Sequence, residues 1–314
     1  MRVKSVAKLQ KKSAGGVCEI QGAYVGRTVC RRGAFSGSYR SEAKGIEIMN
    51  TLERSLVEKA GYDNGWEVTL RGDPSEGTLA PVKLASARHG AVAEVAALKK
   101  SSPESEAFFT VRFVRGPEAL GRELARETCV KDEHFEAAGH KGLSALLRRA
   151  SQLAISLPRN AEEQFVRKAA EAIKELKTST TEVERVVRQR VGQDVFRVAL
   201  MSYWEGACSV TGINQPEVLR ASHAKPWVDC ESDAERLGVY NGLLLTANLD
   251  ALFDRGLISF DEDGVLLIAD ALSDEVVRQL GLDKELKMRW IAPDHKKYLD
   301  WHRNRVFRRN VNHD

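Results

Sequence analysis

Four residues in the stretch 190–260 have the types and spacing that hydrolysis of a phosphodiester requires. His223 ends the apolar segment VLRASH, and Asn241 begins the segment NGLLL. Asp250 and Asp254 follow four residues apart, so on a helix their carboxylates project from one face and can share a cation. This hydrolysis needs a base for the attacking water, a cation beside the phosphate and a group that holds the base. The stretch offers a candidate for each.

Each position has a chemical interpretation, and a structural alternative stays open beside it. His223 is the candidate base, and Asn241 offers an amide or a backbone carbonyl that can hold the imidazole. Asp250 and Asp254 are the candidate metal ligands, and their hard oxygen donors favour Mg²⁺ or Mn²⁺ over zinc. The alternatives are a structural histidine, a hairpin turn at Asn241, a helix cap at Asp250 and a surface ion pair of Asp254 with Arg255.

Several neighbouring side chains extend this interpretation to a polyanionic partner. The candidate phosphate contacts are Lys225, Arg255, His302 and Arg303, with solvated surface positions as the alternative. Trp227 is more typical of core or lid packing than of a stacking platform for a base. Cys208 and Cys230 are expected to be small buried residues, because a zinc site would need further ligands.

The run of His223, Asn241 and Asp250, with a second acid at Asp254, resembles the HNH nucleases of the ββα-metal fold. The words that carry the likeness to HNH domains of bacterial restriction endonucleases are RVGQDVFR, CSVTGI, SHAKPW, NGLLLTANLDALFDRGLISF and YLDWHR, over roughly residues 180–310. The resemblance implies metal-dependent cleavage of duplex DNA. It makes His223 the general base, positioned by Asn241, and Asp250 a metal ligand with Asp254 as a further one. Ser222 stands where many members have another ligand, so the ligand set stays open.

The elements that must position these residues follow from the local patterns. A strand ending at His223, a loop, a strand starting after Asn241 and a short helix carrying both aspartates give a β–loop–β–α order. Upstream, a sequence typical of a capping box at 178–182 opens a helix that runs through VERVVRQRVGQDVFRVALMSYWEG.

The first half of the chain predicts an α+β domain. VCEIQGAYVGRTV and FFTVRFV alternate like strands, and KGIEIMNTLERSLVEKAGY predicts a helix that stops at Gly61. The residues of that helix at helical spacing are Ile46, Met49, Leu52, Leu56 and Val57. From about Glu118 the pattern becomes helical, and LPRN separates two helices, with Asn160 as the expected N-cap of the second.

Length and composition set the outer limits of this organisation. The chain has 314 residues, 43% hydrophobic and 29% charged, which is typical of globular proteins and long enough for two domains. We predict an α+β fold with a recognition domain at 1–135, a helical connector at 136–178 and a ββα-metal nuclease domain at 179–314. No apolar run approaches the length of a membrane span or a secretory signal, and the five scattered cysteines include no CxxC, so we expect a cytoplasmic location with reduced thiols.

The net charge is only +4, but residues 1–40 hold nine Lys/Arg and one acid. This arm is either a phosphate-contacting surface or a solvated tail. The segment GAYVGRTVCRRGAFSGSYRSEAKGIEIMNTLERSL is similar to the N-terminal domain of McrA-type endonucleases, which depend on modified cytosine. That similarity implies a reader of a modified base such as methylcytosine, with Arg27, Arg31 and Arg40 among its DNA contacts; the alternative places its aromatic residues in a core.

Together these observations predict a metal-dependent HNH restriction endonuclease acting on double-stranded DNA, with dependence on a modified base as an extension. A homodimer is expected, because cutting both strands needs two sites, and no membrane partner is expected. The alternative is a DNA-binding or effector protein with a retained but weakly active HNH fold. That alternative rests on Ser222 leaving the metal with few ligands.

Overall fold

The strands of the first half build one antiparallel sheet. The computed structural model describes residues 46–47, 49–70, 81–98, 107–128, 130–131, 133–176, 180–283 and 285–308. The sheet order is β2-β3-β4-β5-β7-β6, and β1 pairs with β4. The strands are β1 (Ile46–Glu47), β2 (Val68–Leu70), β3 (Val82–Ala85), β4 (Val92–Leu98), β5 (Phe108–Arg115), β6 (Val130–Lys131) and β7 (His134–Ala138).

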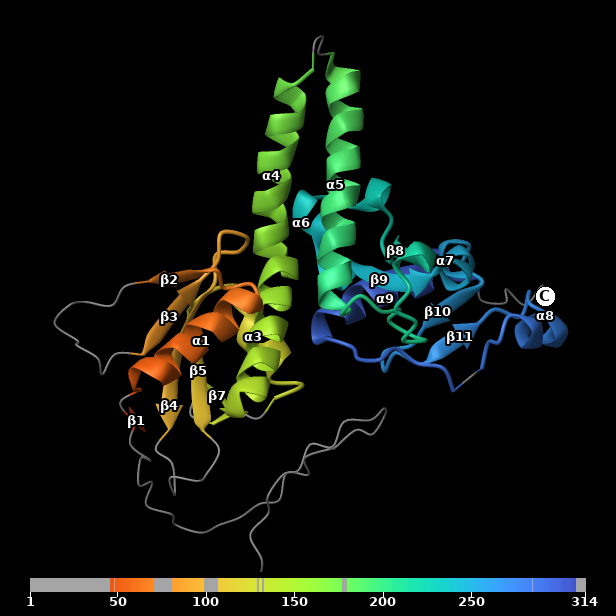
Figure 1. Cartoon of the computed structure of the whole chain (residues 1–314). Coiled ribbons are helices and arrows are strands. Elements are labelled where there is room, and N and C mark those ends of the chain that lie inside the picture. Colours follow the sequence, from red (N-terminus) through yellow and green to blue (C-terminus); the bar gives the residue numbers. More distant parts are fainter. Residues whose placement is uncertain are drawn as a thin grey trace, which may run out of the picture. The chain divides into compact units, whose positions relative to one another are not determined.

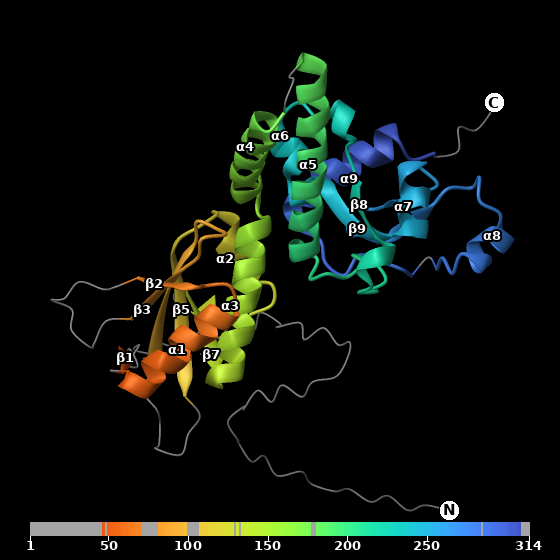
Figure 2. The same cartoon turned by 45° about the horizontal axis from the view of Figure 1, so that its top comes forward.

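One face of this sheet is the apolar one, because side chains alternate along each strand. Leu84, Ala93, Val95, Phe109 and Val111 are fully buried or nearly so. Helices α1 (Thr51–Asp63) and α3 (Gly139–Ser156) pack together and against the strands (Figure 1). Helix α2 (Ala119–Leu124) packs on α3 (Figure 2). The α+β prediction is therefore confirmed for this part of the chain.

The helix predicted from residue 46 starts later than expected. Ile46 lies in β1, and α1 begins after Asn50, which forms a capping box with Glu53. Val57 is buried, but Leu52 is 68% exposed and Leu56 38%. These two leucines therefore lie on the exposed side of α1, because the side that carries Val57 packs on the sheet.

A second correction concerns the break between α3 and α4 (Pro158–Lys174). Pro158 occupies the first turn of α4 and Leu157 is its N-cap. Asn160 lies inside that turn, buried, where its Nδ2 donates to the carbonyl of Ile155 at 2.8 Å. It ties the two helices together and is not the N-cap, because proline already fits the first helical position without an N–H to satisfy.

Helix α4 and helix α5 (Thr181–Tyr203) run side by side as a hairpin (Figure 1). Thr180 caps α5 by accepting a hydrogen bond from the backbone N–H of Val183. Helix α3, which falls in the predicted connector at 136–178, packs on α1, α2, β5 and β7 and shares their core.

The last third of the chain surrounds a two-stranded sheet formed by β8 (Leu219–His223) and β9 (Gly242–Thr246). Helix α7 (Ala247–Asp254) follows β9 directly, which confirms the β–loop–β–α order, and α5 and α7 both pack on the hairpin (Figure 2). The other elements are η2 (Pro216–Val218), η3 (Trp227–Asp229), α6 (Asp233–Leu237), η4 (Val239–Asn241), β10 (Ile258–Phe260), β11 (Leu266–Ile268), α8 (Asp274–Gln279) and α9 (Pro293–Arg305).

Within the described segments, no helix is both long and apolar enough to cross a lipid bilayer.

Candidate active site

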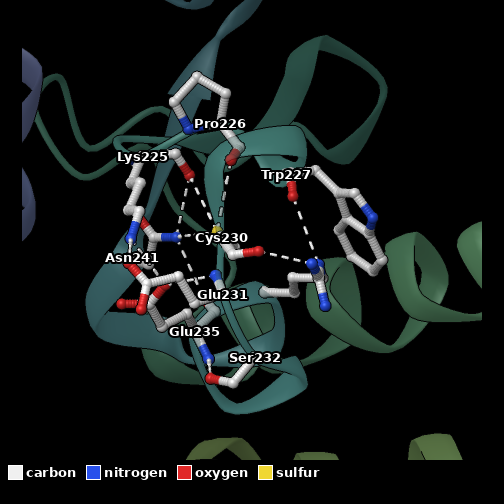
Figure 3. A network of polar contacts seen from close by, with 9 residues as sticks. Lys225, Pro226, Trp227, Cys230, Glu231, Ser232, Glu235 and Asn241 are labelled. Carbon is white, nitrogen blue, oxygen red and sulfur yellow. Dashed lines mark hydrogen bonds and ion pairs between the residues drawn. The ribbon is translucent and has the colours of Figure 1, made fainter. Parts of the chain in front are cut away.

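Asn241 fastens the loop that joins β8 to β9. Its side chain is fully buried, and its Oδ1 accepts from the backbone N–H of Lys225 at 2.7 Å. Its Nδ2 donates to the carbonyls of Lys225 and Glu235 at 3.0 and 3.1 Å, and lies 3.3 Å from the Sγ of Cys230 (Figure 3). One amide therefore joins both ends of the loop, and its hydrogen-bonding capacity is used within the protein.

The loop carries a second fastening in the ion pair between Lys225 and Glu235. The Nζ of Lys225 lies 2.8 Å from Oε2 of Glu235, and the same carboxylate oxygen accepts from the backbone N–H of Glu231 at 2.9 Å (Figure 3). These contacts lower the pKa of Glu235. The lysine side chain is only 11% exposed. The structure thus corrects the prediction of Lys225 as a phosphate contact, because its ammonium is enclosed and already paired.

Arg236 holds the same loop from the other side. Its guanidinium donates to the carbonyls of Trp227 and Cys230, at 3.3 and 2.5 Å, and to the Asp233 carboxylate at 3.1 Å. Its own backbone carbonyl lies 2.8 Å from Nε2 of His223. Arg236 therefore holds the loop through its guanidinium and the ring of His223 through its backbone carbonyl.

His223 is held in the tautomer that a general base needs. A carbonyl oxygen can only accept, so Nε2 of the neutral ring donates to Arg236 and Nδ1 is left as the proton acceptor. The ring stacks on Phe196 of α5, with centroids 3.8 Å apart and planes at 12°, and meets the edge of Trp227 at 6.0 Å. Burial lowers the pKa of His223. The imidazole is therefore neutral at pH 7 and able to take a proton.

Two glycines allow the aromatic rings to come this close. A Cβ on Gly242, the residue paired with His223 across the hairpin, would lie 2.5 Å from Cζ of Phe196. A Cβ on Gly192 of α5 would lie 2.3 Å from the ring of Trp227. Trp227 packs against the small cluster between α4 and α5, which agrees with its predicted packing role.

The two aspartates lie on α7, as predicted, and Ser222 of β8 reaches Asp254. The hydroxyl of Ser222 lies 3.2 Å from Oδ1 of Asp254. Partial burial and the neighbouring charge of Asp250 raise the pKa of Asp254. Two carboxylates that repel one another beside a hydroxyl are a donor set that a hard divalent cation would neutralise, so the residues present fit Mg²⁺ or Mn²⁺.

The protein supplies few ligands at this position. In the described part of the chain, no cluster of three or more His, Cys, Asp or Glu side chains is arranged to hold a metal ion. Asp250 and Asp254 would hold the cation with help from Ser222, water and substrate oxygens, a pattern common for Mg²⁺.

Two of the predicted phosphate contacts point into the protein. His302 is 1% exposed, stacks on Phe253 at 3.7 Å, and its two ring nitrogens lie 2.9 Å from Oγ of Ser259 and 3.0 Å from the carbonyl of Phe253. The prediction for His302 is therefore wrong: it is a core residue.

Arg303 is corrected in the same way, because its side chain is 12% exposed and donates to the carbonyl of Phe260 and to Asp300. Arg255 is exposed at the end of α7, with one contact to the carbonyl of Ala251, and stays a candidate. Arg27, Arg31 and Arg40 lie outside the described residues.

A comparison with protein families bears on the segment that contains this hairpin. Residues 208–261 match the family model of the HNH endonucleases. The C-terminal region contains an HNH endonuclease domain. The match covers β8, the fastened loop, β9, α7 and β10, and it confirms the predicted resemblance. No curated protein matches the chain. The McrA-like interpretation of the N-terminal segment has no support, since the match begins at Cys208.

The HNH domain also depends on residues that sequence reasoning missed. Arg236 supports His223 through a backbone atom, and Phe196 stacks on it from outside the matched segment. Glu123 of α2, with a side chain only 2% exposed, accepts hydrogen bonds from Tyr240 and Tyr203 at 2.9 and 3.0 Å. Tyr240 directly precedes Asn241, so α2 helps to hold the residue that fastens the loop.

Proposed function

We propose that this protein is a metal-dependent endonuclease that hydrolyses phosphodiester bonds in double-stranded DNA. The observation that carries the proposal is the environment of His223, whose Nε2 is bound to the Arg236 carbonyl and whose lowered pKa leaves a neutral Nδ1. That state suits a general base at neutral pH. The HNH family match supports a nuclease acting on DNA, and the donor set on α7 supports the metal.

In the proposed mechanism, Nδ1 of His223 takes the proton of a water that attacks the phosphorus in line with the departing oxygen. The Arg236 carbonyl stabilises the resulting imidazolium through Nε2–H, and Phe196 keeps the ring plane fixed. Asp250 and Asp254 would hold the divalent cation. When bound, such an ion supplies neutralisation of charge on the phosphate and on the departing oxygen. Asn241 acts through the loop, since no described contact joins its side chain to the ring.

Two extensions belong to the same proposal. Cleavage of both strands needs two sites, so we propose a homodimer that brings two HNH domains to one duplex. We also propose that the protein restricts foreign DNA that carries a modified base. In that case the first domain would recognise the modified base. Neither extension rests on the geometry of His223, and each can fail while the nuclease proposal stands.

Conversion of supercoiled plasmid to nicked and linear forms tests the proposal. Wild-type protein with Mg²⁺ or Mn²⁺ should cleave methylated or unmethylated plasmid, and EDTA should stop the reaction. His223→Ala should lower the rate by about 10²–10⁴-fold, the typical contribution of a positioned base. His140→Ala is the matched control, because His140 is an exposed histidine on α3. Absence of metal-dependent cleavage on every substrate would refute the proposal, and full activity of His223→Ala would refute the assignment of the base.

The alternative of a weakly active HNH fold is favoured by one observation, the presence of Ser222 where a further ligand could stand. The same assay separates the two functions. A binding or effector protein would retain DNA with unchanged affinity in His223→Ala while wild-type protein cleaves little even at millimolar metal.

A further inference from the structure

A basic pocket outside the HNH domain lies where the turn between β3 and β4 meets α4 and α5. Its volume is about 550 Å³. Arg88 comes from the turn, Arg167 and Lys168 from α4, and Val195, Val198 and Ala199 from α5. We call this cavity the Arg167 pocket. None of these residues has a part in the mechanism above.

The charged side chains of the Arg167 pocket are all cationic. No Asp or Glu is found among the lining residues that the structure describes. Gln164 joins the turn to α4: its Nε2 donates to the backbone carbonyl of Arg88 at 3.5 Å and its Oε1 accepts from the guanidinium of Arg167 at 2.5 Å. The Nε of Arg88 lies 3.6 Å from Glu67, whereas the exposed Arg167 and Lys168 form no ion pair with a described carboxylate. Positive charge is thus concentrated around one cavity, where it favours an anion.

Part of the lining of the Arg167 pocket is apolar. Ala161 and Ala199 are 2% exposed and Val195 is 5% exposed, so they form a buried floor, while Val198 is 53% exposed at the rim. A floor of small and branched apolar side chains accepts a flat hydrophobic ring. A ligand that satisfies both parts of the lining carries an anionic group and a planar body, and a nucleotide has both, with a phosphate on the cations and a base on the floor.

We propose that the Arg167 pocket binds a nucleotide, in addition to the phosphodiester at the HNH site. The inference rests on the proposed function, because a DNA substrate supplies such a unit, but a free nucleotide has the same chemistry. Helix α5 joins the two sites: Val195, Val198 and Ala199 line the pocket, while Phe196 stacks on His223. Occupation of the pocket would therefore place the ligand on the helix that supports the base.

Binding measurements in EDTA test the pocket without cleavage. The probes are dAMP, a single-stranded 20-mer and a duplex 20-mer. Val198→Glu places a carboxylate among the cations at an exposed position, and should weaken binding by about tenfold or more through repulsion of phosphate. Arg167→Ala should weaken it in the same direction. The matched control is Arg188→Ala, which removes an exposed arginine of α5 that does not line the pocket.

Each outcome decides between the possibilities. Loss of dAMP binding in Val198→Glu supports a pocket that accepts free nucleotides, and a loss confined to an oligonucleotide supports a pocket for DNA. Binding of all three probes as in wild type and in Arg188→Ala overturns the inference. Plasmid cleavage by wild-type protein, measured in parallel, keeps the tests apart: cleavage with unaltered binding in Val198→Glu refutes the pocket alone, and altered binding without any cleavage refutes only the nuclease.

Discussion

At the scale of single residues, the environment of His223 sets both its protonation and its orientation. The ring is enclosed by Phe196 and Trp227, and this burial lowers its pKa below the ordinary value of 6.5. A general base works in its neutral form, so activity should fall on acidification only below pH 6.5. The side chains of Phe196 and Trp227 therefore set the pH at which activity falls.

Phe196→Leu should therefore move the acid limb of the pH profile. Loss of the stacked ring admits water to His223, which raises the pKa of the base towards 6.5 and loosens its orientation. We expect the acid limb of kcat/KM to shift to higher pH, and kcat at pH 8 to fall by about tenfold. Plasmid cleavage rates between pH 5 and 9 measure both. A loss of kcat with an unmoved acid limb would show that Phe196 supports only the fold.

The negative charge of Asp254 is unfavourable in the metal-free protein and is compensated when a cation binds. Partial burial and, after it, the charge of Asp250 raise the pKa of Asp254, so a neutral amide should be tolerated in the metal-free protein. Asp254→Asn should leave the melting temperature in EDTA unchanged or higher. It should also raise the Mg²⁺ concentration for half-maximal cleavage by about tenfold or more.

The matched control for Asp254→Asn is Asp263→Asn, an exposed aspartate in the turn between β10 and β11. A metal requirement that is equal in both variants would remove Asp254 from the ligand set. Thermal melts with and without Mg²⁺ give an independent check, since the gain of stability from the ion should shrink in Asp254→Asn alone.

At the scale of elements, the HNH loop is held by a helix from the first half of the chain. Glu123 of α2 lies 117 residues from Tyr240 in sequence; its carboxylate accepts from Tyr240 and Tyr203 and forms an ion pair with Arg126. Its side chain is 2% exposed, so each donor compensates part of the cost of burying the charge. The contact fixes the middle residue of η4, directly before Asn241.

Tyr240→Phe should destabilise the protein and disturb the loop. The variant leaves a buried carboxylate with one donor fewer, and we expect the free energy of unfolding to fall by about 1–3 kcal/mol. Because Asn241 follows directly, kcat should fall while KM for DNA stays within about twofold. Urea unfolding and cleavage kinetics measure these effects. Tyr62→Phe is the control, since Tyr62 is 68% exposed on α1, and an equal response in both variants would contradict the link.

The local elements of the site could be predicted from sequence, because their signals are local. Short apolar runs and the Asn-Gly turn signal predicted β8 and β9, and a spacing of four placed Asp250 and Asp254 on one face of α7. The support of His223 could not be predicted in this way. The acceptor for His223 is the backbone carbonyl of Arg236, a group that every residue has, so no residue type marks it in the sequence. Phe196 reaches the ring only through the packing of α5 on the hairpin.

The error at His302 has a local cause that the sequence did contain. His295, Leu299 and His302 recur at spacings of four and three, and all three are buried on one face of α9. The basic residues beside His302 favoured its interpretation as a phosphate contact, whereas the helical period of the apolar and histidine residues indicated a core position. Periodicity is the stronger signal here, because a buried histidine needs only one or two hydrogen-bond partners to be satisfied.

At the scale of the whole molecule, three buried histidines couple folding to pH. Burial lowers the pKa of His89 and His302 to about 4 and that of His295 to about 3, all below the ordinary 6.5. As the pH falls through 6.5, the unfolded chain takes up these protons while the folded protein stays neutral. Stability is therefore highest above pH 6.5 and is lost between pH 6.5 and about 4, by up to about 1.4 kcal/mol per pH unit for each histidine.

His295 allows this coupling to be tested, because it is fully buried and its Nε2 has no hydrogen-bond partner among the described residues. Urea unfolding at pH 7.5, 6 and 5 should show a steep loss of stability in the wild-type protein. His295→Asn should be less stable at pH 7.5 but lose less on acidification, by about one proton's contribution. His140→Asn, at an exposed position, should keep the wild-type slope. If His295→Asn also keeps that slope, burial of this imidazole does not contribute to the acid sensitivity of the fold.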